Sequence, residues 1–151
     1  MEQEKMNAWQ KEWPIKGFDF SRAGDGAMQL KDVMRRLGLP GDVIRRASVG
    51  AYEAELNVII HARRGVMRAS VTAEETKVVV EDEGPGIADV SQAMCEGFST
   101  APPEIREMGF GAGMGLPNMK RCADELVIDS KPGVGTSVSM LFRHQRGADH
   151  E

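Results

Sequence analysis

The sequence has 151 residues, of which 41% are hydrophobic and 28% are charged, and its formal net charge is −4 at pH 7. This length and composition indicate one globular domain that can bury a core without disulfides or structural metals. The acidic balance argues against nucleic-acid binding and against binding to anionic membranes. No apolar run approaches the roughly 18 residues of a membrane-spanning helix, and the polar N-terminus does not resemble a signal peptide. The two cysteines lack CxxC spacing, so we expect a reduced protein in the cytoplasm.

The first part of the chain is expected to contain two helices after a polar extension. Weak alternation over Ile15–Ser21 predicts an edge strand. Over Gly24–Gly38, apolar residues recur at helical spacing and predict an amphipathic helix. Asp42–Ala62 is the longest helical stretch, and a stripe of alanine and valine should face the core.

The rest of the chain is predicted to contain four strands and two short helices. We expect strands at 66–72, 76–82, 125–130 and 136–142, and the last two should form a hairpin around Lys131-Pro132-Gly133. Helices are expected at 90–96 and from 116 onward, with an irregular stretch at 97–115 between them. Because several strands alternate apolar and polar residues, the sheet should be mostly antiparallel with one face buried under helices. This is a two-layer α/β (α+β) sandwich. We expect the domain to span residues 14–143, between a polar extension at 1–13 and a loose tail at 144–151.

The long predicted helix carries Glu53, Asn57 and His61 on nearly one face, since they are spaced i, i+4 and i+8. Apolar residues surround Asn57, and a buried amide costs about 1–3 kcal/mol unless it finds partners. Either a structural hydrogen bond or a ligand must supply those partners, and the spacing leaves both open. For His61, a hydrogen bond near the helix end is favoured over metal ligation, because no second ligand stands at useful spacing.

Asp82 follows an apolar strand and opens the turn Asp-Glu-Gly-Pro-Gly. A carboxylate at such a partly buried edge can accept a hydrogen bond from a ligand donor, for example an adenine amino group. Gly84 and Gly86 allow a sharp turn and a close approach of the backbone. An ordinary Asp-rich turn explains the same residues equally well.

Four glycines at every second position, from Gly109 to Gly115, precede the helix that begins near Leu116. Backbone N–H groups without neighbouring Cβ atoms can converge on an anion, and the helix N-terminus adds partial positive charge. This favours phosphate binding over a flexible linker. The loop lacks the GxxxxGK[ST] of a P-loop, and the GxGxxG pattern of Rossmann domains and protein kinases is absent as well.

The motifs occur along the chain in the order found in GHKL (Bergerat-fold) ATPases. ExxxN at 53–57 resembles their N box, DxGxG at 82–86 resembles their G1 box, and the glycine loop at 109–115 resembles their G2 box. GxGT at 133–136 resembles their late glycine-threonine segment. Within this family, residues 15–142 resemble the bacterial anti-sigma factor kinases and the stressosome switch kinases, which are serine/threonine kinases. The resemblance implies the histidine-kinase-like ATPase fold.

The resemblance also implies ATP and Mg²⁺ as ligands and a role for each motif residue. Asn57 would hold the metal through its amide oxygen, and Asp82 would accept from the adenine amino group. Glu53 would be the catalytic general base. The other residues of the implied nucleotide site are Gly84, Gly86, Gly109, Gly111, Gly113, Gly115, Leu116 and Thr136.

In such kinases the phosphate acceptor is a serine or threonine of a small STAS-domain antagonist protein, and a sigma factor or another regulator is a further partner. A homodimer is compatible with the same resemblance. Two alternatives remain: a binding module that uses ATP only to grip a partner, and the catalytic half of a histidine kinase, although no dimerisation helix with a phosphoacceptor histidine is recognisable. Ala101–Met108 lengthens the join to the glycine loop, which leaves open the subgroup and whether Arg106 reaches the nucleotide.

Overall fold

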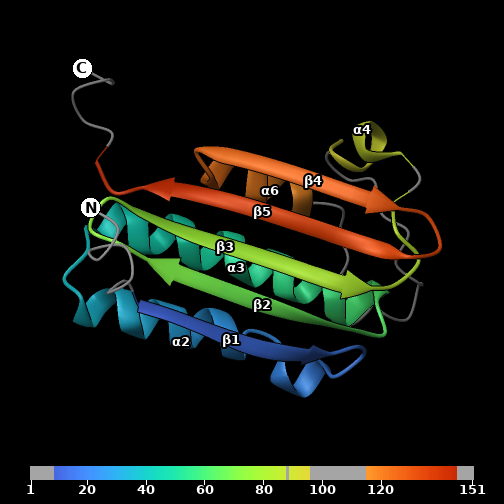
Figure 1. The fold of residues 1–151 in the computed structure, drawn as a ribbon, viewed down its shortest axis with the longest axis horizontal. Coiled ribbons are helices and arrows are strands. Elements are labelled where there is room, and N and C mark those ends of the chain that lie inside the picture. The colour runs from blue at the N-terminus through green and yellow to red at the C-terminus, as the bar shows by residue number, and fades with distance from the viewer. Residues whose placement is uncertain (1–8, 88, 96–114, 146–151) are drawn as a thin grey trace.

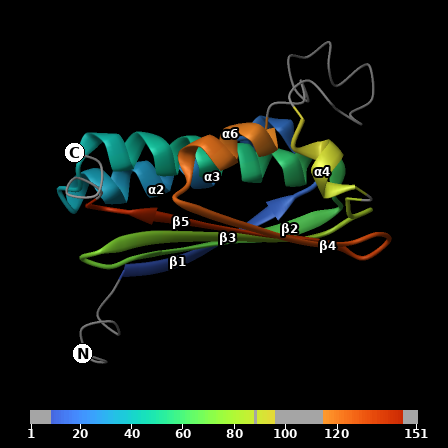
Figure 2. The same ribbon diagram turned by 90° about the horizontal axis from the view of Figure 1, so that it is seen from above.

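Five strands form one antiparallel sheet in the order β1-β2-β3-β5-β4, with helices stacked on a single face (Figures 1 and 2). The computed structural model describes residues 9–87, 89–95 and 115–145. The strands are β1 (Trp9–Lys16), β2 (Arg64–Val71), β3 (Glu75–Glu83), β4 (Glu125–Lys131) and β5 (Gly135–Arg143). The predicted two-layer sandwich is therefore confirmed.

The helical layer is built around the 21-residue helix α3, which lies behind the middle of the sheet in Figure 1. The helical elements are η1 (Phe20–Arg22), α2 (Asp25–Arg36), α3 (Gly41–His61), α4 (Val90–Ala93) and α6 (Gly115–Cys122). Pro117 stands in the first turn of α6, as its missing N–H requires. None of the helices in the described ranges is long and apolar enough to cross a membrane.

The sheet buries the face that its alternating residues predict. Along β5, Val138, Met140 and Phe142 point to the helices and are at most 3% exposed, whereas Ser139 and Leu141 between them are half-buried. The β2 residues Met67 and Ala69 pack into the same core. Burial of each large apolar side chain contributes about 1.5–3 kcal/mol relative to its exposure. The sheet thus packs against the helices on one face only.

The N-terminal strand differs from the prediction in its position. The sequence predicts a polar extension at residues 1–13 and an edge strand at Ile15–Ser21, but β1 starts at Trp9 and ends at Lys16. The reason is tertiary: every residue of β1 pairs with β2, and the Trp13 indole Nε1 donates to Gln29 on α2 at 2.8 Å. These long-range contacts override weak local alternation.

The C-terminal boundary differs in the same way. His144, which we placed in the loose tail, is 7% exposed. Its Nε2 shares a 2.8 Å hydrogen bond with the Thr76 hydroxyl, and its Nδ1 lies 3.1 Å from the carbonyl oxygen of Ala73. Thus the ordered body extends past the end of β5.

Two buried charged side chains fix the helices. Arg46 of α3 donates to Asp42 on its own helix at 2.8 Å and to the carbonyl of Cys122, at the end of α6, at 3.0 Å. Its guanidinium also lies 3.4 Å from Asp124. Glu55 accepts the backbone N–H groups of Gly26 and Ala27 in the first turn of α2, each at 3.1 Å. These contacts join α3 to α6 and α2, so they set the orientation of the helix that carries Glu53 and Asn57.

Candidate functional site

Glu53 and Asn57 lie one turn apart on α3, and both side chains are partly buried. The Asn57 amide makes no hydrogen bond to any side chain or backbone group in the described part of the chain. Because the side chain is only partly buried, water or a ligand can complete its hydrogen bonds, so both interpretations of Asn57 stay open. One turn further on, burial lowers the pKa of His61 below its ordinary value, which favours a neutral imidazole.

Asp82 stands near the end of β3, on the same face of the sheet as Val78 and Val80, which face the helices. Its Oδ1 accepts the backbone N–H of Thr136 at 3.1 Å. Burial raises the pKa of the carboxyl, and the Thr136 N–H opposes that effect. No cation pairs with Asp82 among the described residues, so its charge is held beside the core without an ion partner. Such a group favours a donor from outside the chain.

Three glycines pack closely around Asp82 and the end of α3. A Cβ at Gly84 would come within 2.9 Å of the Ala62 Cβ. At Gly135 a Cβ would collide with the Asp82 carbonyl oxygen. Gly65, which pairs with Asp82 across the β2–β3 ladder, would place a Cβ 3.2 Å from the Asp82 Cβ. Gly65 was not a predicted site residue, so its close packing against Asp82 was missed.

The turn after β3 is tied to the tip of the β4–β5 hairpin. Gly86 adopts a φ of 74°, and a Cβ there would collide with the Lys131 carbonyl oxygen, so only glycine fits. The Ser130 hydroxyl accepts the N–H of Ile87 at 2.6 Å and shares a 2.8 Å hydrogen bond with the Thr136 hydroxyl. Sequence reasoning missed Ser130, although the predicted hairpin places it opposite Thr136 and so contained the signal.

Glu53 faces the first residues of α6. The Asn118 amide Nδ2 donates to Glu53 Oε2 at 2.8 Å, and Arg121 donates to Asn118 Oδ1 at 2.6 Å. A Cβ at Gly115 would lie 3.6 Å from Glu53 Oε1, so the end of the glycine loop lies next to this carboxylate. Asn118 was not a predicted site residue, and no local motif identifies it.

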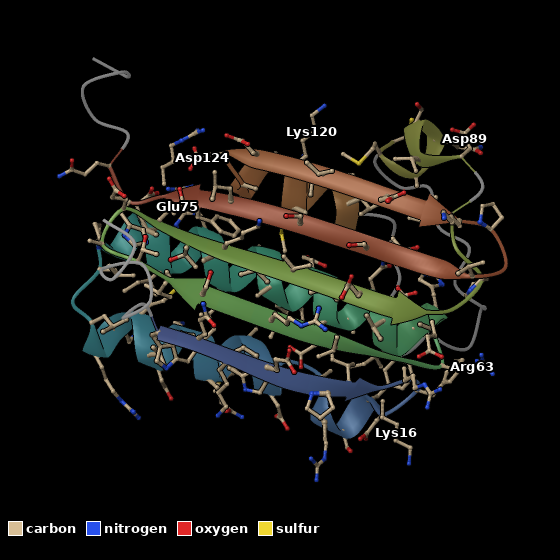
Figure 3. The ribbon with its side chains drawn as sticks, viewed as in Figure 1. Lys16, Arg63, Glu75, Asp89, Lys120 and Asp124 are labelled. Carbon is tan, nitrogen blue, oxygen red and sulfur yellow. The ribbon has the colours of Figure 1, made fainter. Side chains whose placement is uncertain are left out.

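The structure therefore joins the predicted residues in two groups along α3. Glu53 lies with Gly115, and Asp82 lies with Gly84 and Thr136 against the last turns of the helix. Ala62, which follows the last residue of α3, lies nine positions after Glu53, a separation of about 14 Å along the helix axis. Figure 3 labels Arg63 at the Asp82 end of the sheet and Asp124 at the opposite end. Gly109, Gly111 and Gly113 lie outside the described residues, and Leu116 is 7% exposed within the hydrophobic core.

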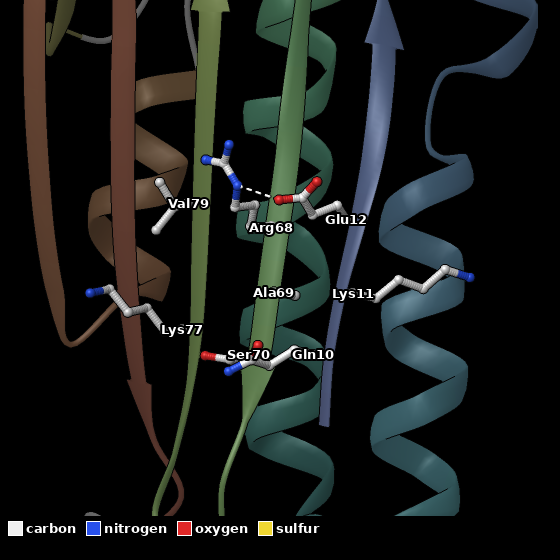
Figure 4. A pocket seen from close by; sticks show the side chains of 8 residues that line it. All are labelled: Gln10, Lys11, Glu12, Arg68, Ala69, Ser70, Lys77 and Val79. Carbon is white, nitrogen blue, oxygen red and sulfur yellow. Dashed lines mark hydrogen bonds and ion pairs between the residues drawn. The ribbon is translucent and has the colours of Figure 1, made fainter. Parts of the chain in front are cut away.

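A separate groove lies on the open face of the sheet, over β1, β2 and β3 (Figure 4). Charged side chains line it, and an ion pair of 2.6 Å joins Arg68 to Glu12 across the strands. Lys77 and Val79 line its other side. These β3 residues alternate with Val78 and Val80, so the groove lies on the face of the sheet opposite Asp82.

The sequence matches the family described as "Histidine kinase-like ATPase domain" over residues 24–142. It is 32% identical over 120 residues to the serine/threonine-protein kinase RsbT of Bacillus subtilis (strain 168), a match that covers 76% of this chain and 84% of RsbT. The anti-sigma F factor of Caldanaerobacter subterraneus subsp. tengcongensis is 41% identical over 93 residues, which are 58% of this chain and 62% of that protein. These relatives agree with the resemblance to anti-sigma factor and switch kinases.

A solved structure, of the RsbU and RsbW domains of Rv1364c from Mycobacterium tuberculosis, aligns with a TM-score of 0.59. The alignment covers 88% of this chain and 32% of that chain, at 15% sequence identity, and so supports the fold alone. Fold, motif order and sequence similarity agree. The chain belongs to the histidine kinase-like ATPase domain family.

Proposed function

We propose that this protein is an ATP-dependent serine/threonine kinase of the anti-sigma factor and switch-kinase type. The observation that supports this most directly is the half-buried Asp82 carboxylate, which Thr136 orients and no cation in the described part neutralises. It offers a charged acceptor to the amino group of adenine. Gly84 and Gly86 form the turn beside it, and because they lack Cβ atoms this turn can pack closely against Ala62 and Lys131.

In the proposed reaction Glu53 is the general base. It takes the proton of a serine or threonine hydroxyl, whose oxygen then bonds to the γ-phosphorus of ATP while the bond to the β-phosphate oxygen breaks and ADP leaves. Glu53 Oε2 already accepts a hydrogen bond from Asn118, so Oε1, beside Gly115, would be the oxygen that takes the proton of the acceptor hydroxyl. Positioning of the two substrates would supply most of the remaining rate enhancement.

The residues present fit a magnesium ion beside the nucleotide. Asn57 offers a hard amide oxygen, is partly buried, and makes no hydrogen bond within the described ranges. We propose Asn57 as the protein ligand, with phosphate oxygens and waters as the ion's other partners. When bound, Mg²⁺ neutralises phosphate charge.

We further propose a STAS-domain antagonist protein as the phosphate acceptor, in the cytoplasm. The similarity to RsbT and to the anti-sigma F factors supports this choice, together with the two free cysteines, which suit a reducing compartment.

The test combines calorimetric titration of ATP, with and without Mg²⁺, with transfer of radiolabelled phosphate to purified STAS domains. The wild type should bind ATP and label one domain, and Glu53→Gln should bind ATP as well but lose about 10²- to 10⁴-fold in transfer rate. Asp129→Asn, an exposed change on β4, is the matched control and should behave as wild type. No ATP binding by the wild type would contradict the whole proposal. Binding without transfer to any STAS domain would instead support the alternative of a non-catalytic ATP-dependent binding module.

A further inference from the structure

We propose that Asn118 is a positioning residue that holds the Glu53 carboxylate for proton transfer, an inference that rests on the proposed kinase function. Asn118 lies on α6 and Glu53 on α3, 65 positions apart in the sequence, and the amide-to-carboxylate distance is 2.8 Å. Both side chains are partly buried, where a hydrogen bond to a charged group is stronger than in open solvent.

The chemistry of the three linked side chains admits one arrangement. Arg121 can only donate and an ionised Glu53 can only accept. The amide between them must therefore turn its oxygen to Arg121, at 2.6 Å, and its NH₂ group to Glu53. A carboxylate at position 118 could still accept from Arg121 but would repel Glu53, and an apolar side chain could bind neither.

Among the described residues, this arrangement leaves one oxygen of the base without a hydrogen bond. Asn118 holds Glu53 Oε2, whereas Oε1 faces Gly115, where even an added Cβ would lie at 3.6 Å. Because one carboxylate oxygen is fixed, Glu53 already has a restricted set of rotamers and loses less conformational freedom when it acts as the base. Because Gly115 ends the glycine loop and Asn118 follows it within one helical turn, the segment that would receive the phosphates also orients the base.

The first experiment measures transfer kinetics on the full chain. Asn118→Leu should lower kcat by about 10- to 100-fold and leave ATP affinity, measured by calorimetry, within about twofold of wild type. In a Glu53→Gln background the same substitution should have no further effect on the rate, since no base remains to be oriented. Lys120→Gln, an exposed change on the same helix, should leave kcat unchanged.

Asn118→Asp provides a readout that a structural role would not move. The added carboxylate disfavours ionisation of its neighbour, so the acid limb of the pH–rate profile should move to higher pH by about one unit or more. Thermal unfolding of each variant shows whether the fold is intact.

A second measurement needs no activity. The NH₂ resonance of Asn118, assigned by its absence in Asn118→Leu, should shift with pH as Glu53 titrates in wild type and should stay constant in Glu53→Gln. A constant wild-type resonance, or a wild-type kcat in Asn118→Leu, overturns the positioning role while the kinase function stands. A wild type that labels no acceptor overturns the kinase function itself, whatever the resonance does.

Discussion

Asp82→Asn should weaken the binding of ATP and leave the fold intact. The amide oxygen of the new asparagine can still accept the Thr136 N–H that Asp82 Oδ1 accepts at 3.1 Å. Its NH₂ group, however, takes the place of the oxygen that would receive the adenine amino group, so two donors would face each other. The variant is therefore expected to keep the local backbone and to lose the proposed base contact.

The magnitude follows from the kind of hydrogen bond that is lost. A hydrogen bond to a charged acceptor is worth about 1.5–3 kcal/mol, which corresponds to a rise in the dissociation constant for ATP of about 10- to 150-fold. The stability of the variant, unlike its ATP affinity, should not decrease. Because burial raises the pKa of Asp82, the folded state binds this proton more tightly than the unfolded state, and the wild type loses stability as the pH rises above the ordinary aspartate range. The neutral variant avoids this loss, so at pH 7 its free energy of unfolding should equal or exceed that of wild type.

Calorimetric titration of ATP at pH 7 measures the first effect, and urea unfolding at pH 7 and at about pH 4, near the ordinary aspartate pKa, measures the second. Any stability gain of the variant should shrink at the lower pH. Asp129→Asn, which changes an exposed carboxylate on β4, is the control for loss of one negative charge. Unchanged ATP affinity in Asp82→Asn would refute the proposed adenine contact.

Three further substitutions, two of them paired with a control, test the scaffold by urea unfolding. Arg46→Met should lower the free energy of unfolding by about 3–5 kcal/mol, because it leaves the buried Asp124 carboxylate without its ion partner. The control Asp42→Asn, at a side chain that is 55% exposed, should lower it by at most about 1 kcal/mol. Burial raises the pKa of the Glu55 carboxyl, so the folded wild type loses stability as the pH rises above the ordinary glutamate range, and Glu55→Gln should flatten this pH dependence. Gly135→Ala should lower the free energy of unfolding by about 1–3 kcal/mol and weaken ATP binding, because the new Cβ would collide with the carbonyl oxygen of Asp82 on β3. The control Gly41→Ala should leave both unchanged, since its Cβ would meet no atom within 4 Å. Equal losses in the last pair would contradict the proposed close packing.

Regular elements with strong periodicity were predictable from the sequence. The expected helix at 42–62 is α3, and the hairpin expected around Lys131 is formed by β4 and β5, because apolar spacing and turn residues specify both locally. The limits of the ordered body were not predictable. Trp9 and His144 are held by residues far along the chain, on β2 and beside Thr76, and no local pattern records such contacts.

The residues of the candidate site also fall into those that the sequence could predict and those that it could not. Motifs predicted Glu53, Asn57 and Asp82 as site residues, because the residues of each motif stand at a fixed spacing within a short stretch of the sequence. The side chain that contacts Glu53, on Asn118, lies on another helix at a distance set only by the packing of α3 against α6. A single sequence contains no signal for such a pair. Ser130 is intermediate, since a correct hairpin register is enough to place it opposite Thr136.

The pairing of β3 with β5 has a consequence for how the protein becomes competent. Asp82 and Thr136 are 54 positions apart, and their hydrogen bond forms only when the C-terminal hairpin has joined the sheet. A growing chain that ends before β5 carries the Asp82 motif but not its oriented acceptor. Long-range strand pairing of this kind closes late in folding. Nucleotide that enters here would bind only the finished domain, and so would draw the last folding step toward completion.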